Sequence, residues 1–459
     1  MSSRPRPALA AGAALVLAAF SLALPYLPVY DPWAWLVWGR ELLQGNFETA
    51  AGPSWKPLPV LIDAPLSLLG DGAPKAWLLV ARTGWLCAPL LAALLAWRLS
   101  GEETGRWRWA AALLAAGSVA LTADAFTPPL RQFTGGLSEP LLVALALGAV
   151  WAALDERPGR ALGLGVAAAL LRPECWPFLA LWAFYASRGR QRLRAAAIVA
   201  LALIPLAWFV PDIIGAGNPL EGGETARAGG IEPFDALEVL GRAMAAPLAA
   251  AWAGVALLLW REREGLDRPL LILLAGAGAW VLLVALMAVG GFAGLPRFLA
   301  PATALVAVLG GVGLARAGAA GRSTTPLVVG ALVLAAVGFA WRAAQVPGDL
   351  EVVERQTRSL DHLFDLVDRT GKASLLACDD TVKQTQVRPQ TATAWKLDGP
   401  ISAVPVRRKP RYGIALSTKP LARGAAIASA GAWRATRLPC PSGYSASERA
   451  IAGVSGAAR

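Results

Sequence analysis

The feature that most constrains the fold of this chain is a series of apolar runs, most of them about one bilayer thickness long. A membrane-spanning helix needs roughly 20 consecutive apolar residues. With 56% hydrophobic and 16% charged residues among 459, the chain lies outside the range of soluble globular proteins. The sequence therefore predicts an all-α polytopic membrane domain over residues 1–343. Its eleven candidate spans, two of them short, cover residues 7–29, 76–97, 109–127, 139–154, 161–171, 175–187, 195–211, 237–260, 269–290, 297–315 and 326–343.

The distribution of arginine between these runs predicts the orientation of the chain. The turns on one side are short and arginine-rich, whereas the loops on the other side are longer and poorer in arginine. The positive-inside rule then makes the arginine-rich side and the N-terminus cytoplasmic. An odd number of spans leaves the C-terminus outside. We assign the net charge of +12 to this topology rather than to nucleic-acid binding, and predict a multi-pass plasma-membrane protein whose first apolar segment is retained.

The last part of the chain, residues 344–459, has a different pattern. Helical periodicity is followed by short strand-like runs at 374–378, 401–406 and 413–417, separated by proline and glycine. This predicts a small extracytoplasmic α/β domain. Its two cysteines, Cys378 and Cys440, are the only ones outside the apolar runs. In an oxidising compartment, we expect them to form a disulfide.

The outer loop over residues 30–75 begins with an acidic residue at the end of the first span. Pro32 fits the first position of a helix, and Asp31 before it is placed to act as the N-cap. Apolar residues and tryptophans then recur at helical spacing as far as Gln44. We interpret this run as a helix in the headgroup layer, where tryptophan rings prefer to lie.

A charged pair at membrane depth is the strongest candidate for a functional site. The apolar run 161–171 spans only about half a bilayer core at 1.5 Å per residue, and a second short run follows it. The two runs meet at Pro173, which predicts that Arg172 and Glu174 face a polar cavity open to the outer side. Such buried charges cost about 2.5 to 3.5 kcal/mol each even on the lenient scale. The alternative interpretation is an arginine and a glutamate that only neutralise each other.

Other polar residues gather on the same predicted side. Asp124 and Arg131 flank a proline pair, Glu139 follows a potential N-cap serine, and Arg297 begins a late span. The helix dipole alone would favour Glu139 in a first turn, and Arg297 fits a snorkelling arginine equally well. Cations at an interface suit a lipid-linked phosphate, and a nearby carboxylate suits a general base. Residue chemistry thus predicts a polar outer-face site.

Four short stretches resemble the GT-C superfamily of integral-membrane glycosyltransferases, in particular the branch of protein O-mannosyltransferases and the lipid A aminoarabinose transferase. Asp31 matches the acid of the first outer loop, and Ser54-Trp55-Lys56-Pro57-Leu58 is similar to a Lys-Pro-Pro-Leu stretch. Leu171-Arg172-Pro173-Glu174 resembles a recurring Arg-Pro-Glu turn, and Pro296-Arg297-Phe298 a late arginine-aromatic element. The second proline of Lys-Pro-Pro-Leu is Leu58 here, and Asp31 has no acidic neighbour.

The resemblance implies an inverting transfer of a sugar from a polyprenyl-phosphate donor to an acceptor hydroxyl on the extracytoplasmic side. In that case Asp31 is the base, and Lys56, Arg172 and Arg297 bind the donor phosphate. The absence of a paired acid implies catalysis without a metal, and no cofactor is expected. Supporting roles would fall to Asp124, Arg131, Glu139 and Glu174. Two other classes stay open: a transporter or flippase of a lipid-linked glycan, and a non-catalytic membrane scaffold.

Overall fold

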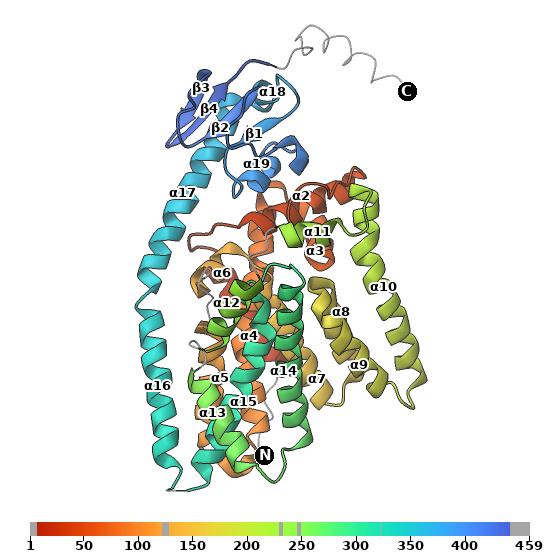
Figure 1. The fold of residues 1–459 in the computed structure, drawn as a ribbon, viewed down its shortest axis with the longest axis vertical. Helices are drawn as coiled ribbons and strands as arrows, with labels where there is room; N and C mark the ends of the chain where they lie inside the picture. The colour runs from red at the N-terminus through yellow and green to blue at the C-terminus, as the bar shows by residue number, and fades with distance from the viewer. Residues whose placement is uncertain (1–6, 122–127, 229–232, 246–248, 322, 441–459) are drawn as a thin grey trace.

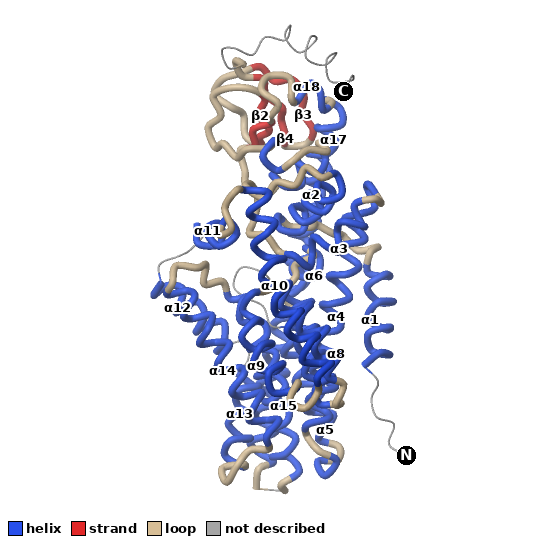
Figure 2. Tube along the Cα trace, turned by 90° about the vertical axis from the view of Figure 1, so that its right-hand side faces the viewer, coloured by secondary structure: helices blue, strands red, loops and turns tan. Residues whose placement is uncertain are grey.

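The computed structural model describes residues 7–121, 128–228, 233–245, 249–321 and 323–440, which form a long helical bundle with a small sheet at one end (Figures 1 and 2). Most of the predicted apolar runs are helical. The helices of the bundle are α1 (Pro7–Ser21), α4 (Ala73–Leu99), α5 (Trp107–Leu121), α6 (Pro129–Gly135), α7 (Glu139–Leu154), α8 (Pro158–Leu171), α9 (Trp176–Ala186), α10 (Gln191–Ala216), α12 (Pro233–Ala245), α13 (Ala249–Arg261), α14 (Arg268–Val289), α15 (Ala300–Ala319) and α16 (Thr325–Ala343).

Helix α15 lies at the centre of the bundle because its glycines let neighbouring backbones approach closely. A Cβ atom on Gly310 would collide with the backbone of Ala251, and one on Gly254 would collide with the backbone of Gly310. Small residues at such crossings are typical of helix packing in membranes, where van der Waals contact drives association. The α13–α15 contact therefore depends on glycine at both positions.

Two predicted spans differ from the observed helices. The first was expected to reach residue 29, but α1 ends at Ser21, and Pro25 and Pro28 stand in the segment that follows. Proline interrupts helices because it lacks an N–H donor. The extended segment bonds instead to the end of α6, with the Val29 N–H donating to the Gly135 carbonyl at 3.0 Å. The predicted span 237–260 is divided between α12 and α13, on either side of residues outside the described part.

The predicted break at Pro173 is present. Helix α8 ends at Leu171, a short 3-10 turn covers Pro173–Cys175, and α9 begins at Trp176. Helices α6 and α7 meet at a second bend, of 95°. Gly136 lies at this bend and adopts a left-handed backbone conformation, with a φ of 70°. Both bends lie toward the end of the bundle that carries the sheet (Figure 1).

The outer loop forms α2 (Tyr30–Gln44) and α3 (Pro57–Ser67), which cross the end of the bundle (Figure 1). Trp33, Trp35 and Trp38 of α2 are at most 3% exposed. The predicted helix is present, but its tryptophans do not face lipid headgroups as expected. They belong to one apolar core shared with the C-terminal region, in which Trp33 meets Phe364 and Trp395. Local periodicity could not reveal this partner, because it lies more than 300 residues further along the chain.

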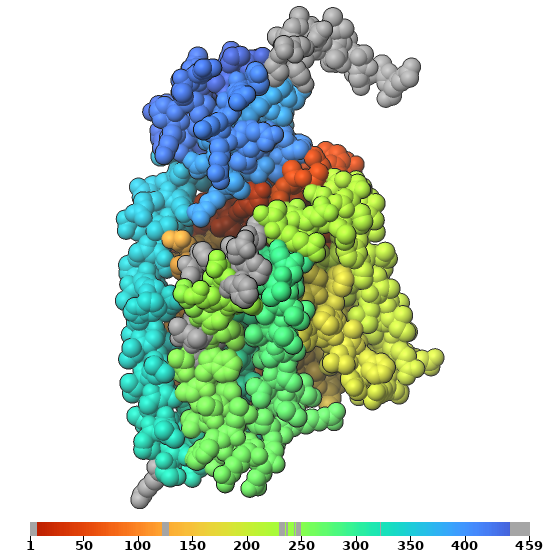
Figure 3. All heavy atoms as spheres, in the orientation of Figure 1, coloured from red at the N-terminus to blue at the C-terminus, as the bar shows by residue number. Residues whose placement is uncertain are grey.

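The C-terminal region caps α2 from the other side (Figure 3). It contains the end of α17 (Val346–Thr370), α18 (Lys372–Leu375), α19 (Gln390–Lys396) and four strands: β1 (Val382–Gln384), β2 (Ile414–Ser417), β3 (Ala425–Ala430) and β4 (Trp433–Arg437). The strand order is β1-β2-β4-β3, with β1 and β2 parallel and the other pairs antiparallel. Cys378 and Cys440 form a disulfide, with their Cα atoms 5.2 Å apart.

The strand predictions in this region are partly wrong. The run 413–417 is strand β2, but 374–378 overlaps the short helix α18, and 401–406 begins as a 3-10 turn with one isolated bridge at Val406. The sheet nevertheless supports the predicted mixed α/β character. The expected division at residues 343 and 344 coincides with the junction between α16 and α17, and the independence of the two parts stays a prediction.

Candidate functional site at the outer end of the bundle

Four segments distant in sequence bring charged side chains together beneath α2 and α3. Asp31 lies in the first turn of α2, and Lys56 directly precedes α3. Arg172 occupies the break between α8 and the 3-10 turn, and Arg297 lies in a 3-10 turn, Pro296–Leu299, before α15. Glu139 begins α7 and joins the cluster from a fifth position. The proline after or before each of these residues fixes a helix start or break there, which aims the side chain away from the regular bundle.

Arg172 forms the buried centre of the cluster. Its Nη2 lies 2.6 Å from Oε1 of Glu139, and its Nη1 lies 3.4 Å from Oε1 of Glu174. The guanidinium also stacks over Phe298, 4.1 Å from the ring centroid. The side chains of both glutamates are at most 4% exposed. Arg172 therefore neutralises two carboxylates that would otherwise be buried at high cost.

Asp31 is held more loosely, between two other cations. Its Oδ2 is 3.9 Å from Nζ of Lys56 and 4.0 Å from Nη2 of Arg297. Both separations exceed the usual hydrogen-bond length of roughly 2.7 to 3.2 Å, and the Asp31 side chain is 19% exposed. The carboxylate is thus attracted by both cations without being held in a hydrogen bond to either.

Lys56 and Arg297 link the Asp31 side of the cluster to the Arg172 side. Arg297 Nε is 3.6 Å from Oε1 of Glu139, and Lys56 Nζ donates to Oγ of Ser138 at 3.2 Å. Lys56 also lies over the Trp35 ring, 4.9 Å from its centroid. Burial lowers the pKa of the Lys56 ammonium to about 8, opposed by the attraction of the Glu139 and Asp31 carboxylates. Three cations and three carboxylates thus form one connected network.

One expected residue lies elsewhere, and another falls outside the described part of the chain. Arg131 points to Asp349 of α17, with Nε 3.9 Å from the carboxylate, rather than into the cluster. Asp124 lies outside the described residues. The expected N-cap role of Asp31 is also wrong, because α2 begins at Tyr30 with Val29 as its N-cap. Within the described residues no three histidine, cysteine or acidic side chains are arranged to hold a metal ion, and metal-free chemistry stays a prediction.

Sequence reasoning missed the contacts that fix the start of α2. The Tyr30 hydroxyl donates to Oε1 of Gln390 at 2.8 Å, and the Thr391 hydroxyl donates to the Tyr30 carbonyl at 2.8 Å. Burial, with a contribution from Asp31, raises the pKa of Tyr30 to about 12, so its hydroxyl stays a donor. Helix α19 of the C-terminal region therefore positions the residue next to Asp31. No local signal in the sequence identifies this contact.

The arrangement is a polytopic helical fold with a charged cluster beneath α2 and α3, and the chain shares this fold with solved structures, which confirms the predicted fold class. One protein of known structure that it matches is ArnT from Cupriavidus metallidurans. With ArnT bound to undecaprenyl phosphate, the TM-score is 0.56 at 14% sequence identity, over 94% of this chain and 97% of ArnT. With apo ArnT, the TM-score is 0.52 at 16% identity over the same shares. No protein-family model and no curated protein sequence matches the chain.

Proposed function

We propose that this protein transfers a sugar from a polyprenyl-phosphate donor to an acceptor hydroxyl, with inversion at the anomeric carbon. The observation that carries the proposal is the convergence of two cations on one carboxylate: Lys56 Nζ lies 3.9 Å and Arg297 Nη2 lies 4.0 Å from Oδ2 of Asp31. The ArnT fold supports it, because the matched ArnT structure binds undecaprenyl phosphate. A site built from one loosely held carboxylate and several cations suits a phosphate and a nucleophile together.

In the proposed reaction, the acceptor oxygen attacks the anomeric carbon while the bond from that carbon to the phosphate oxygen breaks. Asp31 takes the acceptor proton. The polyprenyl phosphate leaves already ionised, so no general acid is needed. Lys56 and Arg297 offset the charge that develops on the departing phosphate, which is the electrostatic stabilisation expected of preorganised cations in a buried site.

Arg172 affects these residues through Glu139. Its guanidinium is engaged by Glu139 and Glu174, and Glu139 in turn contacts Arg297. We therefore assign Arg172 two functions. It holds the glutamate that orients Arg297, and it adds positive charge near the phosphate. The interpretation of Arg172 and Glu174 as an isolated pair does not account for the link through Glu139 to Arg297.

Turnover by purified protein in proteoliposomes tests the proposal. A panel of polyprenyl-phosphate sugars, each radiolabelled in the sugar, is supplied with detergent-extracted envelope glycans as acceptors. We expect release of free polyprenyl phosphate together with label in the acceptor. Movement of the intact labelled donor across the bilayer, with no cleavage of the sugar-phosphate bond, would instead establish the flippase alternative.

We further propose the orientation inferred from the arginines, with the charged cluster and the C-terminal region outside. Lys419 of the C-terminal region and Arg192 at the start of α10 are both exposed. A cysteine at position 419 is expected to react with a membrane-impermeant maleimide in intact cells, whereas one at position 192 should react only after permeabilisation. The reverse pattern would place the cluster in the cytoplasm and exclude a donor on the outer leaflet.

The pKa of Lys56 predicts a pH limit on activity. Since Lys56 must be protonated to attract a phosphate, and its pKa is lowered to about 8, kcat/KM should fall as the pH rises through about 8. This parameter reports the ionisation of the free enzyme. Arginine cannot lose its proton in this range, so Lys56→Arg should remove the alkaline limb, even if its maximal rate is lower. An unchanged limb in Lys56→Arg would assign the ionisation to another group.

A further inference from the structure

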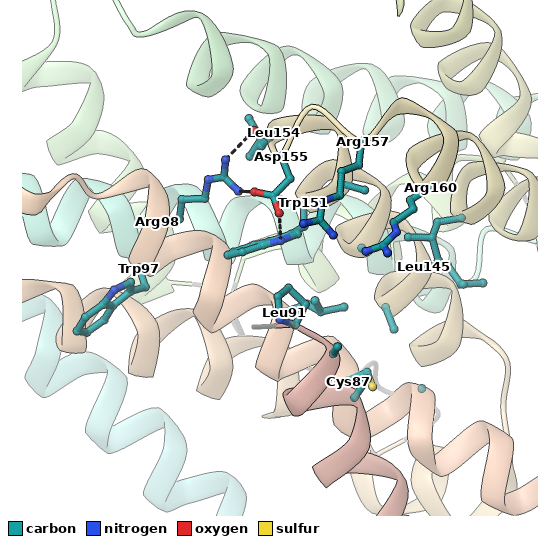
Figure 4. Close-up of a pocket in the computed structure, with 18 of the residues that line it drawn as sticks. Cys87, Leu91, Trp97, Arg98, Leu145, Trp151, Leu154, Asp155, Arg157 and Arg160 are labelled. Carbon is teal, nitrogen blue, oxygen red and sulfur yellow. Dashed lines mark hydrogen bonds and ion pairs between the residues drawn. The ribbon is translucent and has the colours of Figure 1, made fainter. Parts of the chain in front are cut away.

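A cavity of about 1730 Å³ runs along the opposite half of the bundle, between α1, α4, α7 and α8 (Figure 4). It is larger than the roughly 300 to 1,000 Å³ that drug-sized ligands occupy. Its walls along the bundle are apolar, with Leu15 of α1, Leu91 of α4, Leu145 of α7 and Leu164 of α8 among them. An elongated apolar space among membrane helices fits hydrocarbon chains better than a soluble metabolite.

One end of this cavity is lined by charged and aromatic residues. Trp97 and Trp151 lie there, at the level where tryptophan marks the membrane interface. The charged lining at this end comprises four arginines and three acids: Arg98, Arg108, Arg157, Arg160, Glu102, Asp155 and Glu156. The cavity therefore combines an apolar body with a charged mouth, in which the arginines outnumber the acids by one.

Not all of these arginines are available to a ligand. Arg98 forms an ion pair with Asp155 and donates to the Leu154 carbonyl at 2.6 Å, and Asp155 also accepts from the Trp151 indole at 3.2 Å. Arg108 is bound to the Trp97 carbonyl at 3.1 Å. By contrast, Arg157 and Arg160 are exposed and make no ion pair with any residue of the described part of the chain. Figure 4 shows these two side chains next to each other at the mouth.

The position of these two arginines in α8 is unfavourable for the helix itself. Arg157 is the N-cap of α8 and Arg160 lies in its first turn. Cations at a helix N-terminus oppose the helix dipole, whereas an anion there is favoured. A bound phosphate would therefore be attracted by both side chains and by the helix end at once. Basic pockets between membrane helices on the cytoplasmic side are suited to anionic lipid headgroups.

This mouth is separate from the candidate catalytic cluster. Helix α7 begins at Glu139, within the cluster, and ends at Leu154 next to the mouth. Its 16 residues make it about 24 Å long at 1.5 Å per residue. Hydrocarbon chains that extend from the arginines over half of a roughly 30 Å bilayer core would follow the apolar walls and end short of Glu139.

We propose that this cavity binds one anionic phospholipid of the leaflet on the arginine-rich side, with its phosphate at Arg157 and Arg160 and its acyl chains along α4, α7 and α8. The occupant is a glycerophospholipid with a net negative charge, such as phosphatidylglycerol. The inference does not depend on the reaction at the opposite end of the bundle. It rests on the charge at the mouth, the unpaired state of the two arginines within the described residues and the size of the apolar space.

Native mass spectrometry of the delipidated full-length protein in detergent, titrated with phosphatidylglycerol or phosphatidylcholine, tests this site. We expect one tightly retained phosphatidylglycerol and no comparable retention of phosphatidylcholine. Arg157→Gln with Arg160→Gln should weaken phosphatidylglycerol about thirtyfold, since each cation near an anionic headgroup contributes about 1 kcal/mol and 1.4 kcal/mol is tenfold. Arg190→Gln with Arg192→Gln, in an exposed turn on the same predicted side, should leave the affinity unchanged.

Two further variants separate the effects of charge and of the apolar space from a folding defect. Arg157→Lys with Arg160→Lys retains the charge, so most of the affinity should return even if the glutamine variant is poorly folded. Leu145→Trp narrows the apolar body without changing any charge and should also weaken uptake. Equal binding by the glutamine and wild-type proteins would overturn the proposal, as would equal retention of phosphatidylcholine. Displacement of the lipid by inorganic phosphate alone, or by polyprenyl phosphate at equal concentration, would assign the cavity to a free anion or to the donor instead.

Discussion

Asp31→Asn is expected to lower turnover by about 10² to 10⁴, the usual effect of removing a general base, while leaving the fold and donor binding intact. Asparagine has nearly the shape of aspartate, so the first turn of α2 loses no contact. The carboxylate is the group that changes, and it lies 3.9 Å from Lys56 and 4.0 Å from Arg297. Single-turnover rates with saturating donor, measured together with donor affinity, separate a chemical defect from a binding defect.

The structure sharpens this test against the interpretation that Asp31 only stabilises a helix start. The N-cap of α2 is Val29, and Asp31 lies in the first turn, where it gains about 0.3 to 1 kcal/mol from the helix dipole. A purely structural Asp31 therefore predicts a small loss of stability and unchanged turnover. Asp398→Asn is a matched control. Asp398 is an exposed acid that pairs with Arg40 of α2, the helix that also carries Asp31. Full activity of Asp31→Asn would remove Asp31 from the proposed mechanism.

The parts of the fold that depend on local physics could be predicted from the sequence. The break between α8 and α9 follows from two apolar runs too short to cross a bilayer and from Pro173 between them. Arg172 and Glu174 then had to find partners, because isolated charges at that depth are too costly. In the structure Arg172 pairs with Glu139, which also contacts Arg297, and the prediction that Arg172 faces the outer side stays a prediction.

The parts that depend on distant partners could not be predicted. Arg131 was expected in the site because it lies on the same side of the membrane, yet it contacts Asp349, more than 200 residues away in sequence. The tryptophans of α2 have the composition of an interfacial helix, and only the C-terminal core that covers them changes their environment. Strand β3, Ala425–Ala430, consists mostly of alanine, which favours helices, and it becomes a strand only by pairing with β4.

Arg172→Met is expected to destabilise the protein by about 3 to 5 kcal/mol, the usual effect of removing one partner of a buried ion pair. Glu139 and Glu174 would both lose their nearest cation, and their side chains are at most 4% exposed. Unfolding in mixed micelles of increasing denaturing detergent measures this change. A matched control is Arg316→Met, because Arg316 also bridges two acids, Glu262 and Asp267. One of these acids is largely exposed, so the control should cost only about 0 to 1 kcal/mol.

A compensated variant separates the structural function of Arg172 from its function at the phosphate. When Arg172→Met is combined with Glu139→Gln and Glu174→Gln, no buried charge is left without its partner, and most of the lost unfolding free energy should return. Turnover should not return, because the site would lack the charge of Arg172 and the carboxylate that orients Arg297. The same compensated variant would then recover stability while its turnover stays low. A compensated variant with wild-type turnover would reduce Arg172, Glu139 and Glu174 to a structural network, and a single variant of unchanged stability would show that neither glutamate depends on Arg172.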